Sequence, residues 1–148
     1  MAANTAPIFS IAPDVQVGGA ILGPTAVTAQ DGTGLLSLIF SADATNGGHV
    51  DTINLKPVGS PVATVARIFF CTAAGAFTSN TTNTAANTAL LTEITLPAIT
   101  LSQIAASSEF QIPIKRPLPP GTKLLIAFAT STGAAGTGYG ITTFAGKY

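Results

Sequence analysis

The chain has 148 residues, of which 47% are apolar and only 8% are charged, compared with about 25% charged residues in a typical soluble domain. Six acidic and six basic side chains cancel, and no basic cluster is larger than Lys115-Arg116. We therefore expect no binding of nucleic acid, which needs a basic surface. The first residues do not resemble a secretory signal, and no run approaches the ~20 apolar residues of a membrane helix, so we expect no membrane partner.

Residues 1–11 are mostly small and apolar, and they predict an N-terminal arm or a first strand. From residue 12 onward, short runs rich in Val, Ile, Leu, Phe and Thr recur, each bounded by Gly, Pro, Asn or Asp. This pattern predicts a single all-β domain over 12–148, a jelly-roll-like antiparallel β-sandwich of about eight strands. The predicted strands are 15–22, 35–42, 50–56, 64–72, 91–96, 109–115, 123–129 and 139–144.

Two of these strands carry further information. In 109–115, apolar and polar residues alternate, and Pro113 cannot donate a ladder hydrogen bond, which favours an edge position or a bulge. In 123–129 both faces are apolar, so the strand should be buried on both sides or lie at an interface. Between them, Pro120 and Gly121 are typical of a type II turn.

The remaining segments are polar or small. The Thr/Asn-rich tract 78–87 has almost nothing to bury and predicts a surface loop. Residues 131–138 contain only Ser, Thr, Gly and Ala, which suits a hairpin loop. Helix is expected only as a turn or two, for example at 102–106.

We expect no enzyme, no cofactor and no metal site. His49 follows a glycine turn, and Cys71 ends an apolar run, so a solvated histidine and a structural cysteine are the favoured interpretations. The stretch 31–34 (DGTG) is interpreted as a turn, and the glycines of 133–140 precede a strand, not the helix that a phosphate loop requires. The acidic residues form no close pair of the kind used in glycoside hydrolysis: Asp14, Asp31, Asp43, Asp51, Glu93 and Glu109.

The two termini are the candidate partner-binding segments. Arms of small residues that end in apolar ones often become ordered only on a neighbouring subunit. The alternative is a terminus that frays or adds a strand to its own sheet. The candidate residues are Asn4, Thr5, Pro7, Ile8, Phe9, Phe144 and Tyr148.

Several stretches resemble small β-sandwich proteins encoded among the virion genes of tailed bacteriophages. They are ANTAPIF at 3–9, DGTG at 31–34, ATVARIF at 63–69, LTEITLP at 91–97 and LPPGTKL at 118–124. The resemblance implies a capsid decoration (cement) protein, made in the host cytoplasm and placed on the capsid surface of the virion. It also implies the partners: the major capsid protein and further copies of the chain, as a homotrimer. No catalytic residues are implied.

Two other interpretations stay open. The chain could be a tail, neck or fibre-tip component, with the loop 78–87 as a recognition tip for the host surface, because polar loops on a rigid sandwich suit variable contacts. It could also be an enzyme or a sugar-binding module. Sugar sites favour exposed aromatic side chains, and this chain has no Trp and two Tyr.

Overall fold

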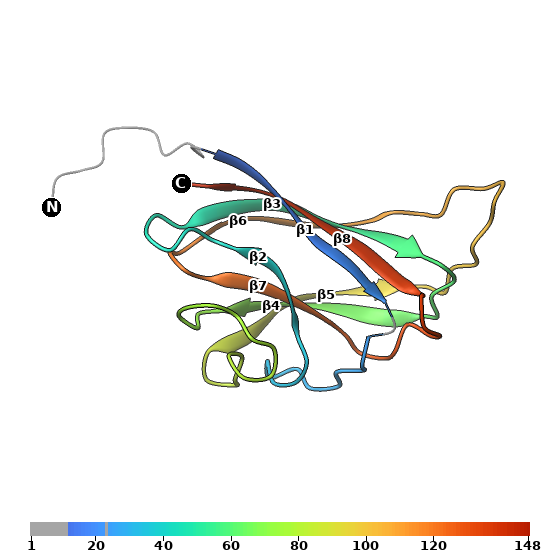
Figure 1. Ribbon diagram of the computed structural model, residues 1–148, viewed down its shortest axis with the longest axis horizontal. Coiled ribbons are helices and arrows are strands. Elements are labelled where there is room, and N and C mark those ends of the chain that lie inside the picture. The colour runs from blue at the N-terminus through green and yellow to red at the C-terminus, as the bar shows by residue number, and fades with distance from the viewer. Residues whose placement is uncertain (1–11, 23) are drawn as a thin grey trace, which may run out of the picture.

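The computed structural model describes residues 12–22 and 24–148 of the chain. These residues form eight strands and no helix, arranged as two antiparallel sheets that pack face to face (Figure 1). The strands are β1 (Ala12–Leu22), β2 (Ser37–Ser41), β3 (Gly48–Val58), β4 (Thr64–Cys71), β5 (Thr88–Leu96), β6 (Phe110–Leu118), β7 (Lys123–Phe128) and β8 (Gly138–Lys147). The described part of the chain contains no helix long and apolar enough to cross a membrane.

The strand order identifies the topology. One sheet, which we call sheet A, has the order β1-β8-β3-β6, and the other, sheet B, has the order β2-β7-β4-β5. The first strand pairs with the eighth, the second with the seventh, the third with the sixth and the fourth with the fifth. A long hairpin rolled into two sheets gives these pairs, and the result is a jelly roll. The predicted fold class is confirmed.

Each predicted strand overlaps an observed one, and the differences lie at the ends. β6 continues beyond the predicted end at residue 115 to Leu118, through Pro117. Proline is tolerated there because β6 is an edge strand that pairs with β3 alone. It also contains a bulge, since Lys115 has a φ of 48° and the register with β3 shifts between Val50 and Thr52. The edge or bulge position predicted from Pro113 is confirmed.

The core between the sheets is built around Tyr139 of β8. Its ring stacks on Phe128 of β7, with centroids 5.5 Å apart, and meets Phe110 of β6 edge-on at 6.4 Å. Burial of each large apolar side chain contributes about 1.5–3 kcal/mol. Buried aliphatic residues of both sheets surround these rings: Ile39, Val50, Ile53, Leu55, Ile68, Leu96, Ile112, Leu124, Ile126 and Ile141.

The turn between β6 and β7 has the predicted form. Gly121 has a φ of 71°, and the backbone N–H of Thr122 donates to the carbonyl oxygen of Pro119 at 3.3 Å. A type II turn requires a positive φ at its third residue, which glycine adopts without strain. The sequence prediction of this turn is therefore confirmed.

Two predictions about connections are wrong. Residues 131–138 do not close a hairpin, because β7 belongs to sheet B and β8 to sheet A, so the segment crosses between sheets. Residues 102–106 form no helical turn. The Ser102 hydroxyl accepts the backbone N–H groups of Ile104 and Ala105 at 3.2 and 3.1 Å, and the segment is exposed. A single turn without packing is unstable.

Sheet B is covered on both faces by the chain itself. Its inner face packs on sheet A, and its outer face lies under the β1–β2 connection (24–36) and the β4–β5 loop (72–87). Every residue of β7 is buried. Of the two interpretations of its apolar faces, burial on both sides is confirmed. The side chains of this second cluster are Val27, Leu36, Phe69, Cys71, Leu125 and Ala127.

Candidate functional site

The outer face of sheet A carries a group of large apolar side chains that are exposed. Val15 and Val17 of β1 are 54% and 73% exposed, and Phe144 of β8 is 41% exposed. Val15 and Phe144 are register partners, so they are neighbours on adjacent strands. We call Val15, Val17 and Phe144 the sheet-A patch. Adjacent exposed apolar side chains are typical of a contact surface for another protein.

The valines of β1 face outward because their polar neighbours are held on the other side. The Gln16 side-chain oxygen accepts the backbone N–H of Ser41 on β2 at 3.1 Å, and its amide donates to Asp14 at 3.0 Å. Asp14 also forms an ion pair with Lys147 at 3.0 Å. Sequence reasoning missed Val15 and Val17 as site residues, because an alternating pattern does not say which of its two faces meets water.

A shallow depression of about 270 Å³ lies beside the patch. Phe144, His49 and Asp51 are among the residues that line it. His49 was expected in a solvated turn, but it is half-buried near the start of β3. The turn ends earlier, because Asp43 and Gly47 exchange backbone hydrogen bonds at 3.1 and 3.2 Å.

The predicted partner-binding residues fall into two groups. Asn4, Thr5, Pro7, Ile8 and Phe9 lie outside the described residues. Phe144 lies in the sheet-A patch, whereas Tyr148 is half-buried at the end of the chain, where its backbone N–H donates to Gly47 at 3.4 Å.

The two ends of the described chain lie side by side. Ala12, the first described residue, pairs with Lys147 of β8, next to the C-terminus (Figure 1). The described part of the chain therefore begins and ends at the same end of the domain.

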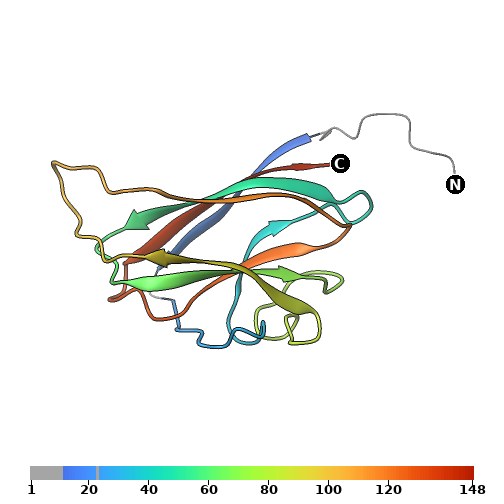
Figure 2. The same ribbon diagram turned by 180° about the vertical axis from the view of Figure 1, so that it is seen from behind.

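A groove of about 330 Å³ lies between the edge strands β5 and β6. Figure 2 views the molecule from the side on which these two strands lie. Arg116 is the one charged residue among those that line the groove. The other lining residues are Phe70, Ala89, Leu90, Leu91, Ile114, Pro117, Leu118 and Pro119.

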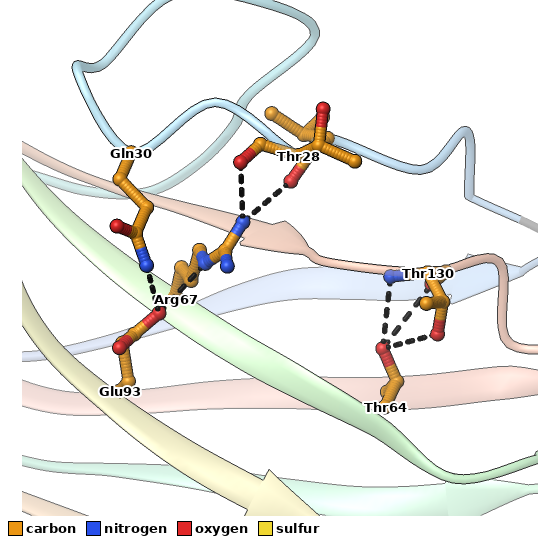
Figure 3. A network of polar contacts seen from close by, with 7 residues as sticks. Thr28, Gln30, Thr64, Arg67, Glu93 and Thr130 are labelled. Atoms are coloured by element: carbon orange, nitrogen blue, oxygen red, sulfur yellow. Dashed lines mark hydrogen bonds and ion pairs between the residues drawn. The ribbon is translucent and has the colours of Figure 1, made fainter.

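A polar network binds the β1–β2 connection (24–36) to the outer face of sheet B (Figure 3). Arg67 of β4 donates from Nε to Glu93 of β5 at 2.7 Å, and from Nη1 to the carbonyl oxygens of Val27 and Thr28 at 2.8 and 3.1 Å. The Gln30 amide donates to the same Glu93 oxygen at 3.2 Å. The hydrogen bond from Arg67 holds the pKa of Glu93 below its usual value. The network therefore fastens the β1–β2 connection to the sheet.

The Thr/Asn tract is a loop, as predicted, but the expectation that it buries almost nothing is wrong at Asn83. This side chain is buried, and its amide donates to the carbonyl oxygens of Gly32 and Gly34 at 2.8 and 3.0 Å. Its oxygen accepts the backbone N–H of Asn80 at 2.8 Å. The loop is thus bound to the turn at 31–34, where Asp31 accepts hydrogen bonds from Thr33.

The candidate nucleophile and the carboxylates have structural partners. Cys71 is fully buried, and its sulfur lies 3.9 Å from the side-chain oxygen of Asn87. Hydrogen bonds from the Thr33 side chain and backbone lower the pKa of Asp31, and those from the backbone N–H groups of Asn46 and Thr45 lower the pKa of Asp43. Among the described residues, no group of three or more His, Cys, Asp or Glu side chains is placed to hold a metal ion.

The sheet-A patch and the β5–β6 groove are thus two apolar surfaces of the domain, and other large apolar side chains, such as Leu101 and Ile104, are exposed outside them. Their composition suits contact with protein. Comparison of the chain with protein-family models, with curated proteins and with solved structures finds no match.

Proposed function

We propose that the chain is a structural virion protein that decorates the capsid of a tailed bacteriophage. In this proposal it binds the outer surface of the shell as a homotrimer and bridges neighbouring copies of the major capsid protein. The capsid is proposed as the partner because the motifs of the chain resemble those of small phage virion proteins. The sheet-A patch provides the contact surface.

The observation that carries the proposal is the difference between the two outer faces. The chain covers much of the outer face of sheet B with its own segments 24–36 and 72–87, and Leu38 on the edge strand β2 stays 37% exposed there. On sheet A, Val15, Val17 and Phe144 lie together in water on two adjacent strands. A chain with 8% charged residues has little electrostatic repulsion to keep such a face free of other subunits. A partner that covers the face removes this apolar surface from water.

Contacts of this small size are sufficient for tight binding when they are repeated over a particle. Burial of apolar surface contributes roughly 25 cal/mol per Å². Each oligomer presents its patch several times, and linked contacts bind far more tightly than one contact alone. Many such bridging contacts over the shell then together resist expansion of the capsid.

The test is sedimentation of the purified chain with phage shells that lack it. We expect saturable binding, with a preserved oligomeric mass in light scattering. Val17→Asp should reduce the binding, whereas Val62→Asp, at an exposed valine outside the patch, should not. A chain that stays monomeric at high concentration and does not sediment with shells contradicts the proposal.

The anchoring of the loop 72–87 by Asn83 favours a second candidate, a tail, neck or fibre-tip protein that contacts the host. Asn83 fixes the loop base, whereas Thr78, Thr81 and Thr84 are exposed. Copy number separates the two candidates, since a decoration protein occupies many sites on the shell and a tail protein few. Replacement of the three threonines by alanine should abolish host adsorption only if the second candidate is correct.

A further inference from the structure

Asn46 is the one asparagine of the chain that is followed by a glycine. Each of the others is followed by Thr or Leu: Asn4, Asn54, Asn80, Asn83 and Asn87. In an Asn-Gly pair the backbone nitrogen of the glycine lies within one small ring of the side-chain carbonyl carbon of the asparagine, and no side chain shields that nitrogen. The nitrogen can attack the carbon, so the pair is a place where the chain can modify itself.

The reaction is a deamidation in two steps. In the first step the Gly47 nitrogen bonds to Cγ of Asn46, its proton passes through solvent to the side-chain amide, and the amide leaves as ammonia, which gives a cyclic succinimide. In the second step water adds to one of the two ring carbonyl carbons and breaks its bond to the nitrogen. Cleavage at Cγ leaves aspartate at position 46. Cleavage at the main-chain carbon leaves isoaspartate, whose backbone is longer by one methylene.

The turn at 43–47, between β2 and β3, presents Asn46 for this reaction (Figure 1). Asn46 is exposed, and none of the described residues binds its side chain. The Gly47 N–H donates to the carbonyl oxygen of Asp43 at 3.2 Å, which is the long end of the usual range. The carbon that is attacked is therefore open to water, and the attacking nitrogen is held by one weak hydrogen bond.

The side chain of Asp43 keeps this turn closed. Its Oδ1 accepts the backbone N–H groups of Thr45 and Asn46 at 2.9 and 2.8 Å. Attack requires that the Gly47 nitrogen leave its hydrogen bond, so the turn must open first. The Asp43 carboxylate thus sets how often Asn46 can react.

The Asp31-Gly32 pair is a poorer site of the same kind. A carboxylate carries a negative charge that opposes attack by a nitrogen, and the hydroxyl and N–H of Thr33 donate to Asp31 at 2.6 and 3.0 Å. Gly32 also packs closely against Thr88. Both reactive groups are thus held in place, which leaves Asn46 as the reactive position.

Gly47 connects the turn to the start of β3 and to the last residue of the chain. Its carbonyl oxygen accepts the N–H groups of Asp43 and Tyr148 at 3.1 and 3.4 Å, and the next residue, Gly48, pairs with Lys147 of β8. An extra methylene between positions 46 and 47 moves Gly47 away from these partners. The new carboxylate also repels Asp43 in the same turn. Isoaspartate therefore weakens this end of the sheet.

We propose that the folded chain deamidates at Asn46 through attack by the Gly47 nitrogen, at a rate set by opening of the turn, and that isoaspartate there releases the C-terminal residues from the start of β3. The change needs only water and is not reversed by it, so it accumulates with the age of the protein. The inference requires no partner and is independent of the proposed function.

The first test is incubation of the purified chain in mildly alkaline buffer, followed by peptide mass spectrometry and enzymatic detection of isoaspartate. We expect conversion at Asn46 to be at least about tenfold faster than at Asn80. Asn80 is a matched control, because it is also exposed and the following N–H, of Thr81, donates to the carbonyl oxygen of Thr78 at 3.2 Å. Equal rates at the two positions, or an unconverted Asn46, overturn the inference.

Two variants test the steps in the structure. Asp43→Ala removes the acceptor of two N–H groups of the turn, so Asn46 should convert about threefold to tenfold faster while circular dichroism stays that of the parent. Asn46→Gln keeps an amide but would need a larger ring, so position 46 should stay unconverted. An unchanged rate in Asp43→Ala overturns the role of the turn.

Hydrogen exchange tests the consequence for the sheet. Amides of 43–50 and 144–148 should exchange faster in the converted chain than in the parent. Freshly purified Asn46→Asp carries the new charge without the extra methylene and should exchange more slowly than the isoaspartate form. Exchange in the converted chain equal to that of the parent overturns the release of the C-terminal residues.

Discussion

The side-chain amide of Asn83 donates to the carbonyl oxygen of Gly32 at 2.8 Å, across 51 positions of sequence. A second bond from the same nitrogen reaches Gly34 at 3.0 Å. Through this one buried side chain, the loop 72–87 and the turn at 31–34 form a single layer over sheet B. That layer leaves sheet A as the sheet with an uncovered outer face.

Replacement of Asn83 should therefore destabilise the domain. Asn83→Ala removes the hydrogen bonds to the carbonyl oxygens of Gly32 and Gly34 and the one from the N–H of Asn80, and only the Gly34 oxygen keeps another donor, the N–H of Leu36. The expected cost is about 1–3 kcal/mol in the free energy of unfolding. Urea denaturation measures the effect. Thr81→Ala, in an exposed position of the same loop, is the control and should change stability by less than about 0.5 kcal/mol. Equal effects of the two substitutions would show that the loop is not anchored by Asn83.

Gly32 and Gly75 form a matched pair for a second prediction. Both have a positive φ, of 86° and 77°, but an added Cβ at Gly32 would lie 2.5 Å from the Cβ of Thr88, whereas nothing lies within 4 Å at Gly75. Gly75→Ala should cost about 1 kcal/mol, from backbone strain alone. Gly32→Ala should cost about 1–3 kcal/mol more, from the steric clash. Thermal unfolding of both variants checks this difference, and similar melting temperatures contradict it.

The Arg67–Glu93 ion pair predicts how stability depends on pH. Because the hydrogen bond from Arg67 lowers the pKa of Glu93 in the folded state, this group stabilises the fold above its unfolded pKa, near 4.5. The contribution is lost as the pH falls through the lower, folded pKa. Glu93→Gln should therefore lower stability at pH 7 and make its decline below about pH 4.5 less steep.

Chemical denaturation at a series of pH values measures this effect. In an Arg67→Met background, Glu93→Gln should change the pH dependence much less, because the principal cause of the pKa shift is gone. An identical pH effect in both backgrounds contradicts the role of Arg67.

The sheet-A patch gives a prediction about binding without a change in folding. Val15→Asp and Phe144→Asp place charges on side chains that are 54% and 41% exposed, so the fold should tolerate them. Each should weaken shell binding about tenfold or more, because a charge loses hydration when a partner covers it. Sedimentation with shells and circular dichroism measure the two properties separately. Binding that is unchanged in both variants would exclude the patch as the contact surface.

The architecture could be predicted from sequence because it depends on local signals. Alternation in 109–115, the Pro120-Gly121 turn and the apolar residues of 123–129 each report on neighbours along the chain. The missed features depend on distant contacts. Asn83 appears as one more polar residue in a polar tract until Gly32 and Gly34 are placed beside it.

The candidate site shows the same limit. Phe144 was a candidate from sequence, but Val15 and Val17 were not, since their exposure depends on Gln16 and Asp14 binding Ser41 and Lys147 on other strands. The β5–β6 groove is formed by strands from both sheets, and no local pattern indicates it. Segment 1–11 was proposed as an arm from its composition, and that prediction remains to be tested.

Electron cryomicroscopy of particles that carry this chain tests the central claim most directly. The account predicts density for an eight-stranded jelly roll at many sites on the capsid surface, with Val15, Val17 and Phe144 of sheet A covered by another protein subunit. Density restricted to a few copies on the tail, or a sheet A whose outer face lies bare in solvent at every site, would contradict it.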